Sequence, residues 1–258
     1  MINVDTFNEI IQNTREFKYS SLNYIEFSDY VNAEVLYNNN DLVMLHDRSK
    51  SPEVLFFATN DFETVINATS ELPSSKLRLH FVPHEYAARL KDLGFSEWGE
   101  YADFWNEDLV STSRYLGNIC EPKFLVKEEC EEVSLLSQRC RLQSRGFEGE
   151  SAEWFMEWLD ENKVIVWREG EEIVGYCCVS IYNEGTTLWI REIAADPTFQ
   201  GKGFGKKLME QAILYGVSNG AVKGFLAADI LNENAIGLYR KYDFHIKGTD
   251  SELQMIRE

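Results

Sequence analysis

The chain has 258 residues, 44% of them hydrophobic and 26% charged, which is enough length for two ordinary domains and a composition typical of folded protein. Its net charge of −18 argues against nucleic acid as a partner, because a nucleic-acid binder needs a basic face. No apolar run reaches the roughly eighteen residues of a membrane span, and the first residues lack the features of a signal peptide, so we expect a soluble, cytoplasmic protein with no membrane partner.

The first half of the chain alternates strand and helix patterns. Apolar residues at helical spacing predict a first helix over Asp5–Phe17. Alternating strand and helix patterns follow at Leu42–His46 (strand), Val54–Ala58 (strand), Asp61–Leu72 (helix), Lys76–Val82 (strand), His84–Leu93 (helix) and Glu97–Leu109 (strand). This order predicts an α/β domain.

The pattern breaks between Val110 and Pro122, where small and polar residues interrupt it. We therefore expect two domains, at residues 1–118 and 119–258.

The second half repeats the alternation with longer elements. Its expected elements are Lys123–Val126 (strand), Glu129–Leu142 and Ser151–Leu159 (helices), Val164–Arg168, Ile173–Ser180 and Thr187–Ala195 (strands), Gly205–Asn219 (helix), Gly224–Ile230 (strand) and a helix from Asn232. A terminal hairpin is expected from Phe244–Lys247 and Leu253–Ile256, with its turn at Gly248. Together these elements predict a mixed α/β sheet covered by helices.

Cysteine usage is that of reduced thiols. The five cysteines form no C-x-x-C pair, and the neighbours Cys177 and Cys178 would face opposite sides of a strand. We therefore expect four of the five to be small buried residues, and no metal site.

Three glycines lie between the strand at Thr187–Ala195 and the following helix. Gly201, Gly203 and Gly205 allow the backbone to approach a ligand closely, and the first turn of a helix offers free N–H groups to an anion. The stretch therefore predicts a phosphate or pyrophosphate site. Lys202, Lys206 and Lys207 make it locally basic.

The spacing identifies the kind of phosphate loop. The single spacers do not fit the dinucleotide fingerprint G-x-G-x-x-G, and no Gly-Lys-Ser/Thr completes a P-loop. The pattern Gln-x-x-Gly-x-Gly, at Gln200, Gly203 and Gly205, resembles the acyl-CoA loop of the GNAT superfamily, the Gcn5-related N-acetyltransferases.

A second motif about thirty residues downstream strengthens the resemblance. Asn232, Ala235, Leu238 and Tyr239, with a closing Phe244, are similar to the family signature Asn-x-x-Ala-x-x-Leu-Tyr-x-x-x-Gly-Phe. Asp243 replaces the usual glycine, and Asp tolerates the left-handed conformation better than most residues. In the first half, His84–Phe95 resembles the last family helix, but no such loop occurs before residue 120. The resemblance thus implies a tandem GNAT-like acyl-CoA N-acyltransferase fold with a degenerate first domain.

The resemblance also implies the binding residues for acetyl-CoA, the co-substrate. The main chain of Ile193 and Ala195 would pair with the pantetheine arm, and Asn232 would contact that arm or simply cap its helix. The residues expected on the pyrophosphate are Gln200, Gly201, Lys202, Gly203, Phe204, Gly205 and Lys206.

Two residues are candidates for catalysis. Tyr239 matches the family tyrosine that protonates the leaving thiolate, a role that suits a phenol with an ordinary pKa near 10; the alternative is a buried core tyrosine. Glu192 beside the loop, or Asp229 at the end of the next strand, could serve as the general base.

The expected function is transfer of acetyl from acetyl-CoA to a primary amine by direct attack in a ternary complex. The alternative is a non-catalytic acyl-CoA-binding regulatory module. The acidic balance favours a cationic small-molecule acceptor, but a peptide amine remains open, as does the choice between monomer and homodimer.

Overall fold

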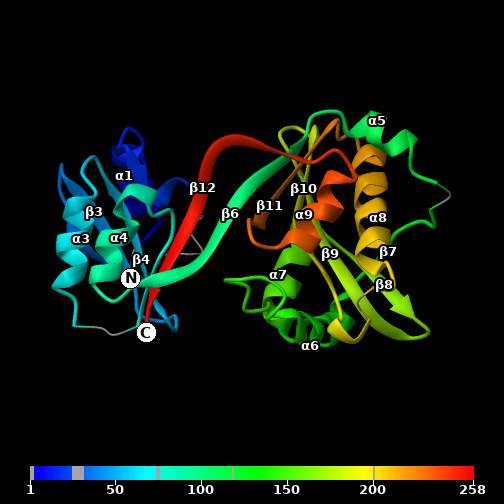
Figure 1. Ribbon diagram of the computed structural model, residues 1–258, viewed down its shortest axis with the longest axis horizontal. Coiled ribbons are helices and arrows are strands. Elements are labelled where there is room, and N and C mark those ends of the chain that lie inside the picture. Colours follow the sequence, from blue (N-terminus) through cyan, green and yellow to red (C-terminus); the bar gives the residue numbers. More distant parts are fainter. Residues whose placement is uncertain (1–2, 25–31, 74–75, 118, 200) are drawn as a thin grey trace. The chain divides into compact units, whose positions relative to one another are not determined.

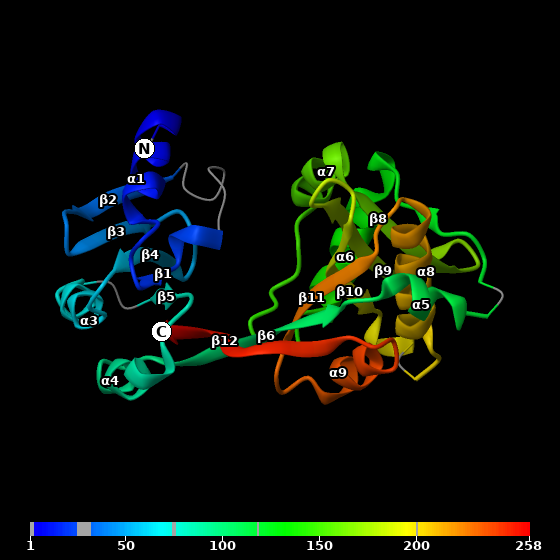
Figure 2. The ribbon, with the colours of Figure 1, turned by 90° about the horizontal axis from the view of Figure 1, so that it is seen from above.

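Two compact units make up the computed structural model, which describes residues 3–24, 32–73, 76–117, 119–199 and 201–258 (Figures 1 and 2). One consists of residues 1–100 and 251–258, and the other of residues 101–250. Both combine helices with mixed sheet, which confirms the predicted α/β class.

The first unit is built around the buried strands β3 and β4. Its elements are α1 (Val4–Thr14), β1 (Tyr19–Ser20), the short 3-10 helix η1 (Leu22–Tyr24), β2 (Ala33–Asn38), β3 (Leu42–Asp47), β4 (Glu53–Thr59), α3 (Glu63–Ser70), β5 (Leu77–Leu79), η2 (His84–Tyr86), α4 (Ala87–Asp92) and the start of β6 (Ser96–Asn106). Leu42 and Met44 pack in the cluster that holds α3 and α4, whereas Val43 and Leu45 pack in the cluster of α1. Burial on both faces explains the unbroken apolar run of β3.

The second unit has longer strands, and its sheet lies between two helical layers. Its elements are the end of β6, α5 (Leu109–Arg114), β7 (Lys123–Phe124), η3 (Lys127–Glu129), α6 (Cys130–Cys140), α7 (Ala152–Glu161), β8 (Lys163–Glu169), β9 (Glu172–Tyr182), β10 (Thr187–Ala195), η4 (Pro197–Phe199), α8 (Phe204–Ser218), β11 (Lys223–Asp229), α9 (Glu233–Arg240) and the start of β12 (His245–Arg257). The strands follow the order β6-β11-β10-β9-β8-β7. Figures 1 and 2 show α5 beside α8.

Alternate residues of β9 serve the two faces of this sheet. Cys177 belongs to the core under α8 and α9, and Cys178 to the core under α6 and α7. The predicted separation of these two thiols is thus confirmed, and both are fully buried.

β6, the last strand in the first half of the sequence, completes the sheet of the second unit. β12, the last strand in the second half, completes the sheet of the first unit. Tyr101–Asn106 of β6 pairs with β11 inside the second unit, and Met255–Arg257 of β12 pairs with β5 inside the first. The boundary between the compact units therefore lies between Glu100 and Tyr101. The sequence pattern instead predicts a domain boundary after residue 118.

The predicted terminal hairpin is wrong. His245–Arg257 forms one continuous strand, in which Gly248 has a φ of +93° but does not reverse the chain. Glycine in this segment indicates a turn when only local sequence is considered, but here the pairing with β5 keeps the strand extended.

In the first unit, β4 and β5 part, and residues of β1 and Ser21 then bind the free edge of β4. The parallel pairing of β4 and β5 ends at Leu55 and Leu79, where β5 stops, while β3 pairs with the other edge of β4. On the vacated edge, β1 pairs with Ala58 and Thr59, and the N–H of Ser21 donates to the carbonyl of Phe57 at 2.9 Å. The first unit therefore keeps no open strand edge at this point of its sheet.

Among the helices that the structure describes, none has both the length and the apolar character that a membrane crossing demands.

We predict that the first unit depends on the returning strand β12. Met255 is fully buried in its core, so Met255→Ala should lower the free energy of unfolding by about 2–5 kcal/mol. Gln254→Ala, one residue away on the other face of the strand, is the matched control. Urea denaturation followed by circular dichroism measures both, and equal stability of the two variants would contradict the prediction.

Candidate active site

The site lies where β10 and β11 part. Their parallel pairing covers only Thr187–Trp189 and Lys223–Phe225, although β11 stays paired with β6 and β10 with β9 along their other edges. Among the described residues, none pairs as a strand with the β11-side edge of Ile190–Ala195. This backbone edge is therefore available to an extended ligand.

A β-bulge changes the direction of side chains at the same point. The register between β9 and β10 shifts between Ile190 and Glu192, so Arg191 is the extra residue. Such bulges re-aim side chains and are common beside active sites. Both Arg191 and Glu192 line the cavity that opens between the strands.

This cavity has a volume of about 770 Å³, within the roughly 300–1,000 Å³ of ligand clefts. It contains ten of the twelve residues that the sequence analysis predicts for the site: Glu192, Ile193, Ala195, Gly201, Gly203, Phe204, Gly205, Lys206, Asn232 and Tyr239. The cavity thus brings together residues of β10, the glycine loop, α8 and α9.

The other two predicted residues differ. Gln200 lies outside the described residues. Lys202 is exposed and does not line the cavity; its Nζ is 4.3 Å from the ring centroid of Phe199. Lys207, the third lysine of the basic stretch, places its Nζ 4.3 Å from the ring centroid of Trp167.

The glycine loop has the geometry that an anion site needs. Gly203 has a φ of +81° and directly precedes α8, which begins at Phe204. A side chain at this φ would be strained, so glycine is required here. The N–H groups of the first turn, next to the cavity, carry the partial positive charge of the helix start.

The loop is anchored at its other end by α6. Arg139 binds buried Asp196 through two nitrogens, at 2.9 Å and 2.8 Å, and Asp196 accepts hydrogen bonds from the backbone and hydroxyl of Thr198. The strand end and the turn before the glycines are therefore held against the second helical layer.

Two residues predicted to contact the cofactor form hydrogen bonds within the protein. The carbonyl of Ala195 accepts from the side-chain amide of Gln143 at 2.9 Å. Asn232 caps α9 by accepting from the N–H of Ala235, and its amide donates to the carbonyl of Gln143 at 3.3 Å. Asn232 is thus a helix cap, and its contact with the cofactor stays a prediction.

Tyr239 is 7% exposed and lines the cavity from α9. Burial, and then the thiol of Cys177, raise the pKa of Tyr239 above the ordinary phenol value, so the hydroxyl carries its proton. None of the described residues hydrogen bonds to this hydroxyl. Its proton is therefore available to a group that enters the cavity.

Glu192 is a buried carboxyl with three polar neighbours. Its oxygens lie 3.1 Å from Nη1 of Arg191 and 3.0 Å from the hydroxyl of Tyr176. Burial, and then the carboxylate of Glu150, raise the pKa of Glu192 to about 8. A carboxyl tuned to this range accepts a proton from an ammonium far more readily than an ordinary one.

Asp229 is not free to act as a base. The guanidinium of Arg145 donates to both of its oxygens, the closest contact being 2.7 Å, and the backbone N–H groups of Arg145 and Leu231 donate as well. Burial opposes ionisation most strongly, but these hydrogen bonds hold the pKa of Asp229 below its usual value. Of the two candidate bases, the structure therefore favours Glu192.

Sequence reasoning missed the segment after α6. Gln143, Ser144, Gly146 and Phe147 line the cavity, and the hydroxyl of Tyr101 donates to the carbonyl of Arg145. These residues form no motif, because their positions depend on long-range bonds to β6 and β11. Gly146 and Gly149, with φ values of +70° and +84°, are local signals of a built loop.

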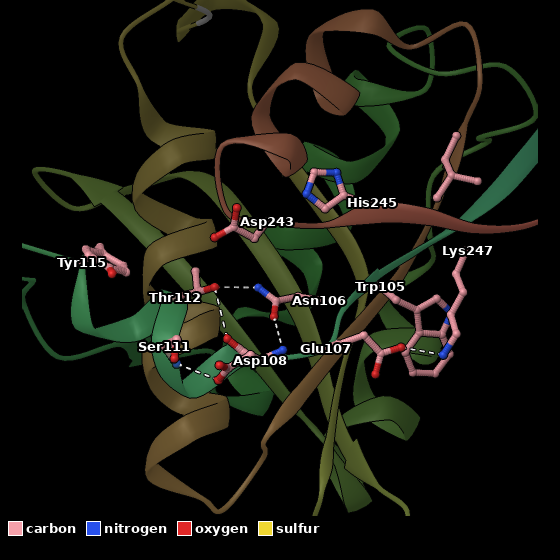
Figure 3. Close-up of a pocket in the computed structure, with 11 residues that line it drawn as sticks. Trp105, Asn106, Glu107, Asp108, Ser111, Thr112, Tyr115, Asp243, His245 and Lys247 are labelled. Carbon is pink, nitrogen blue, oxygen red and sulfur yellow. Dashed lines mark hydrogen bonds and ion pairs between the residues drawn. The ribbon is translucent and has the colours of Figure 1, made fainter.

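A second cavity, of about 530 Å³, lies elsewhere in this unit (Figure 3). Its polar groups bind one another: Asn106 donates to Thr112, Ser111 donates through its N–H to Asp108, and Lys247 pairs with Glu107. None of the eleven predicted residues that the structure describes lines it, so the cavity between β10 and β11 is the candidate active site.

The chain resembles known proteins over the same region. Residues 131–244 match the model of the acetyltransferase (GNAT) family. This stretch of the chain is therefore similar to a GNAT acetyltransferase domain. An uncharacterized N-acetyltransferase of Methanocaldococcus jannaschii is 30% identical over 104 residues, which are 37% of this chain and 46% of that protein.

Solved structures extend the likeness to the first half. A functionally unknown conserved protein of Staphylococcus epidermidis superposes with a TM-score of 0.60 at 13% identity, covering 91% of this chain and 98% of its own. A GCN5-related N-acetyltransferase of Sphaerobacter thermophilus gives 0.52 at 13% identity, covering 86% and 82%. At these identities the likeness shows the fold, and it confirms the predicted GNAT-like architecture for most of the chain.

We predict that the Arg145–Asp229 pair stabilises the second unit. Asp229 is only 2% exposed, so Arg145→Met leaves a buried charge without its partner and should cost about 3–5 kcal/mol in unfolding free energy. Arg141→Met removes an exposed arginine four residues earlier and is the control. Chemical denaturation compares the two, and similar midpoints would argue against the assigned role of Arg145.

Proposed function

We propose that the second unit transfers the acetyl group of acetyl-CoA to a primary amine by direct attack in a ternary complex. One observation carries this proposal: Glu192 and Tyr239 line the same cavity as the glycine loop and the start of α8. A phosphate-binding helix start, a proton acceptor and a proton donor thus face one space.

The open edge of β10 supports acyl-CoA as the ligand. Ile193 and Ala195 lie on the part of β10 that has left β11, where an extended pantetheine arm has backbone partners; at Ala195 the arm would share the carbonyl with the side-chain amide of Gln143. At the same end of the cavity, Gly201, Gly203 and the first turn of α8 suit a pyrophosphate. Phe204 is 4% exposed, so its contribution is to seat the helix start rather than to bind phosphate through its ring.

The residues support a balanced reaction. Glu192 takes a proton from the acceptor ammonium, and the freed nitrogen attacks the thioester carbonyl carbon. The carbon–sulfur bond breaks, its electron pair leaves with sulfur, and Tyr239 gives that sulfur its proton. The proton that the new amide nitrogen releases restores the phenol.

The cysteine in the cavity supports direct attack over a covalent relay. Cys140 is 1% exposed, and burial, followed by the charge of Asp196, raises the pKa of its thiol to about 12. A protonated thiol is a poor nucleophile, so Cys140 is not suited to hold the acetyl group.

An amine panel tests the function. Purified protein with acetyl-CoA and a set of polyamines, aminoglycosides and peptide amines should release CoA thiol with at least one acceptor, and calorimetry should find one acetyl-CoA site per chain. Gly203→Val, which forces a branched residue to a positive φ, should weaken acetyl-CoA binding roughly tenfold. Binding without turnover on any acceptor would favour a non-catalytic acyl-CoA-binding module.

We predict that Tyr239→Phe lowers kcat by about 10²–10⁴ and leaves acetyl-CoA binding unchanged, because only the proton donor is lost. Tyr242→Phe is a comparison on the same stretch: the hydroxyl of Tyr242 donates to Glu210 and does not line the cavity. Steady-state kinetics with the best acceptor measures both. Full turnover by Tyr239→Phe would remove Tyr239 from the mechanism.

A further inference from the structure

A second carboxylate, Glu150, lies beside Glu192. One guanidinium nitrogen, Nη1 of Arg191, is 3.2 Å from Glu150 Oε1 and 3.1 Å from Glu192 Oε1. Arg191 and Glu192 line the cavity, whereas Glu150 does not; it lies in the loop between α6 and α7. Two carboxylates therefore share one positive charge.

The backbone of Glu150 is fixed on α6. Its N–H donates to Ser137 Oγ and its carbonyl accepts from Ser134 Oγ, both at 2.9 Å. The preceding Gly149 has a φ of +84°, and a Cβ there would lie 2.8 Å from the Cα of Gln138. Only glycine fits this close approach, so the loop is built to hold Glu150 in place.

Arg191 is held equally well. Its guanidinium lies over the ring of Trp154, 4.3 Å from the centroid, and Trp154 stacks on Trp158. A cation in contact with an aromatic face is stabilised without losing its charge. Arg191 therefore remains between the two carboxylates.

The second oxygen of Glu192 meets Tyr176 from β9. The Tyr176 hydroxyl is 3.0 Å from Glu192 Oε2 and 2.8 Å from Ser137 Oγ. Burial, and then the charge of Glu192, raise the pKa of Tyr176. This hydroxyl therefore stays protonated and donates a hydrogen bond to the carboxylate. Ser137 thus links the loop of Glu150 with the partner of Glu192.

Charge balance decides which carboxylate takes a proton. Two carboxylates and one guanidinium carry a net negative charge, and like charges this close do not both ionise easily. Glu150 is 24% exposed and Glu192 12%, so water stabilises the charge of Glu150 better. The other ionisable groups near Glu192 are buried, and burial raises the pKa of each: Tyr176, Cys140, Cys177 and Cys178.

We propose that Glu150 is a positioning residue for acyl transfer: by sharing Arg191 with Glu192, it makes Glu192 the carboxyl that accepts the proton of the acceptor ammonium. The inference rests on the proposed function. It adds a residue that does not touch the cavity and that acts only through Arg191 and Glu192.

Glu150→Gln tests the inference. The substitution keeps the shape of the side chain and removes its charge, which leaves Glu192 and Arg191 as a neutral pair. Glu192 should then ionise at a pH about one unit lower or more. Nuclear magnetic resonance of isotope-labelled glutamate carboxyls measures its titration without any ligand, and Glu192→Gln assigns the signal.

The same shift should appear in turnover. In the wild type, kcat/KM for the best amine of the panel should rise with pH through about 8, because Glu192 must be ionised to accept a proton. In Glu150→Gln this rise should move to lower pH by the same amount, while the KM for acetyl-CoA stays within about twofold. Glu157→Gln removes an equal charge from an exposed position of α7 and should change neither measurement.

The outcomes separate the two proposals. An unchanged titration of Glu192 in Glu150→Gln overturns the inference, even if the protein acetylates amines. A shifted titration with no turnover by any variant overturns the proposed function and, with it, the catalytic role of Glu150. A shifted titration with an unmoved pH profile also overturns that role. If Glu150→Gln does not fold, Glu150→Asp, which keeps the charge but withdraws it by one methylene, should shift both measurements in the same direction.

Discussion

The parting of β10 from β11 after Trp189 is the constraint on which the site depends. A strand that leaves its neighbour exposes backbone N–H and C=O groups, and such groups need partners wherever they are buried. The first unit meets the same need where β4 leaves β5, and there its own residues Tyr19–Ser21 supply the partners. In the second unit the corresponding edge of β10 faces a cavity instead. The strand edge is thus closed in the first unit and faces a cavity in the second. The closed edge explains physically why the half without a glycine loop is not expected to hold a cofactor.

The bulge at Arg191 follows from the same strand and supplies the chemistry. Neighbouring residues of a regular strand point to opposite faces, yet Nη1 of Arg191 lies 3.1 Å from Glu192. The extra residue in the register brings both side chains to the cavity side. A cation beside the carboxyl opposes protonation, whereas burial and Glu150 favour it. Without Glu150, burial would still favour the proton, but the like charge that adds to this effect would be lost.

The parts of the site that local sequence encodes were predictable, and those that long-range pairing creates were not. The spacing of Gly203 and Gly205 at the start of α8 indicates the loop by itself. Asn232 and Tyr239 lie at the two ends of α9, as its N-cap and in its last turn. The exchange of β6 and β12 has no local signature, so the sequence indicates a hairpin at Gly248 where the strand runs on. The role of Glu150 depends on contacts with residues 13 to 41 positions away, through Ser137 and Arg191, and no motif encodes such contacts.

Helix α6 connects these features. Ser134 and Ser137, one turn apart, hold the loop of Glu150, while Arg139 holds Asp196 before the glycine loop. Just past its end, Gln143 binds both the carbonyl of Ala195 and the amide of Asn232. The carboxyl proposed to accept protons and the loop proposed for the pyrophosphate are therefore both linked to one helix, whose inner face is buried in the second core. A displacement of α6 would change the geometry at both ends of the cavity together, which is why the residues that hold this helix matter to the site although few of them line the cavity.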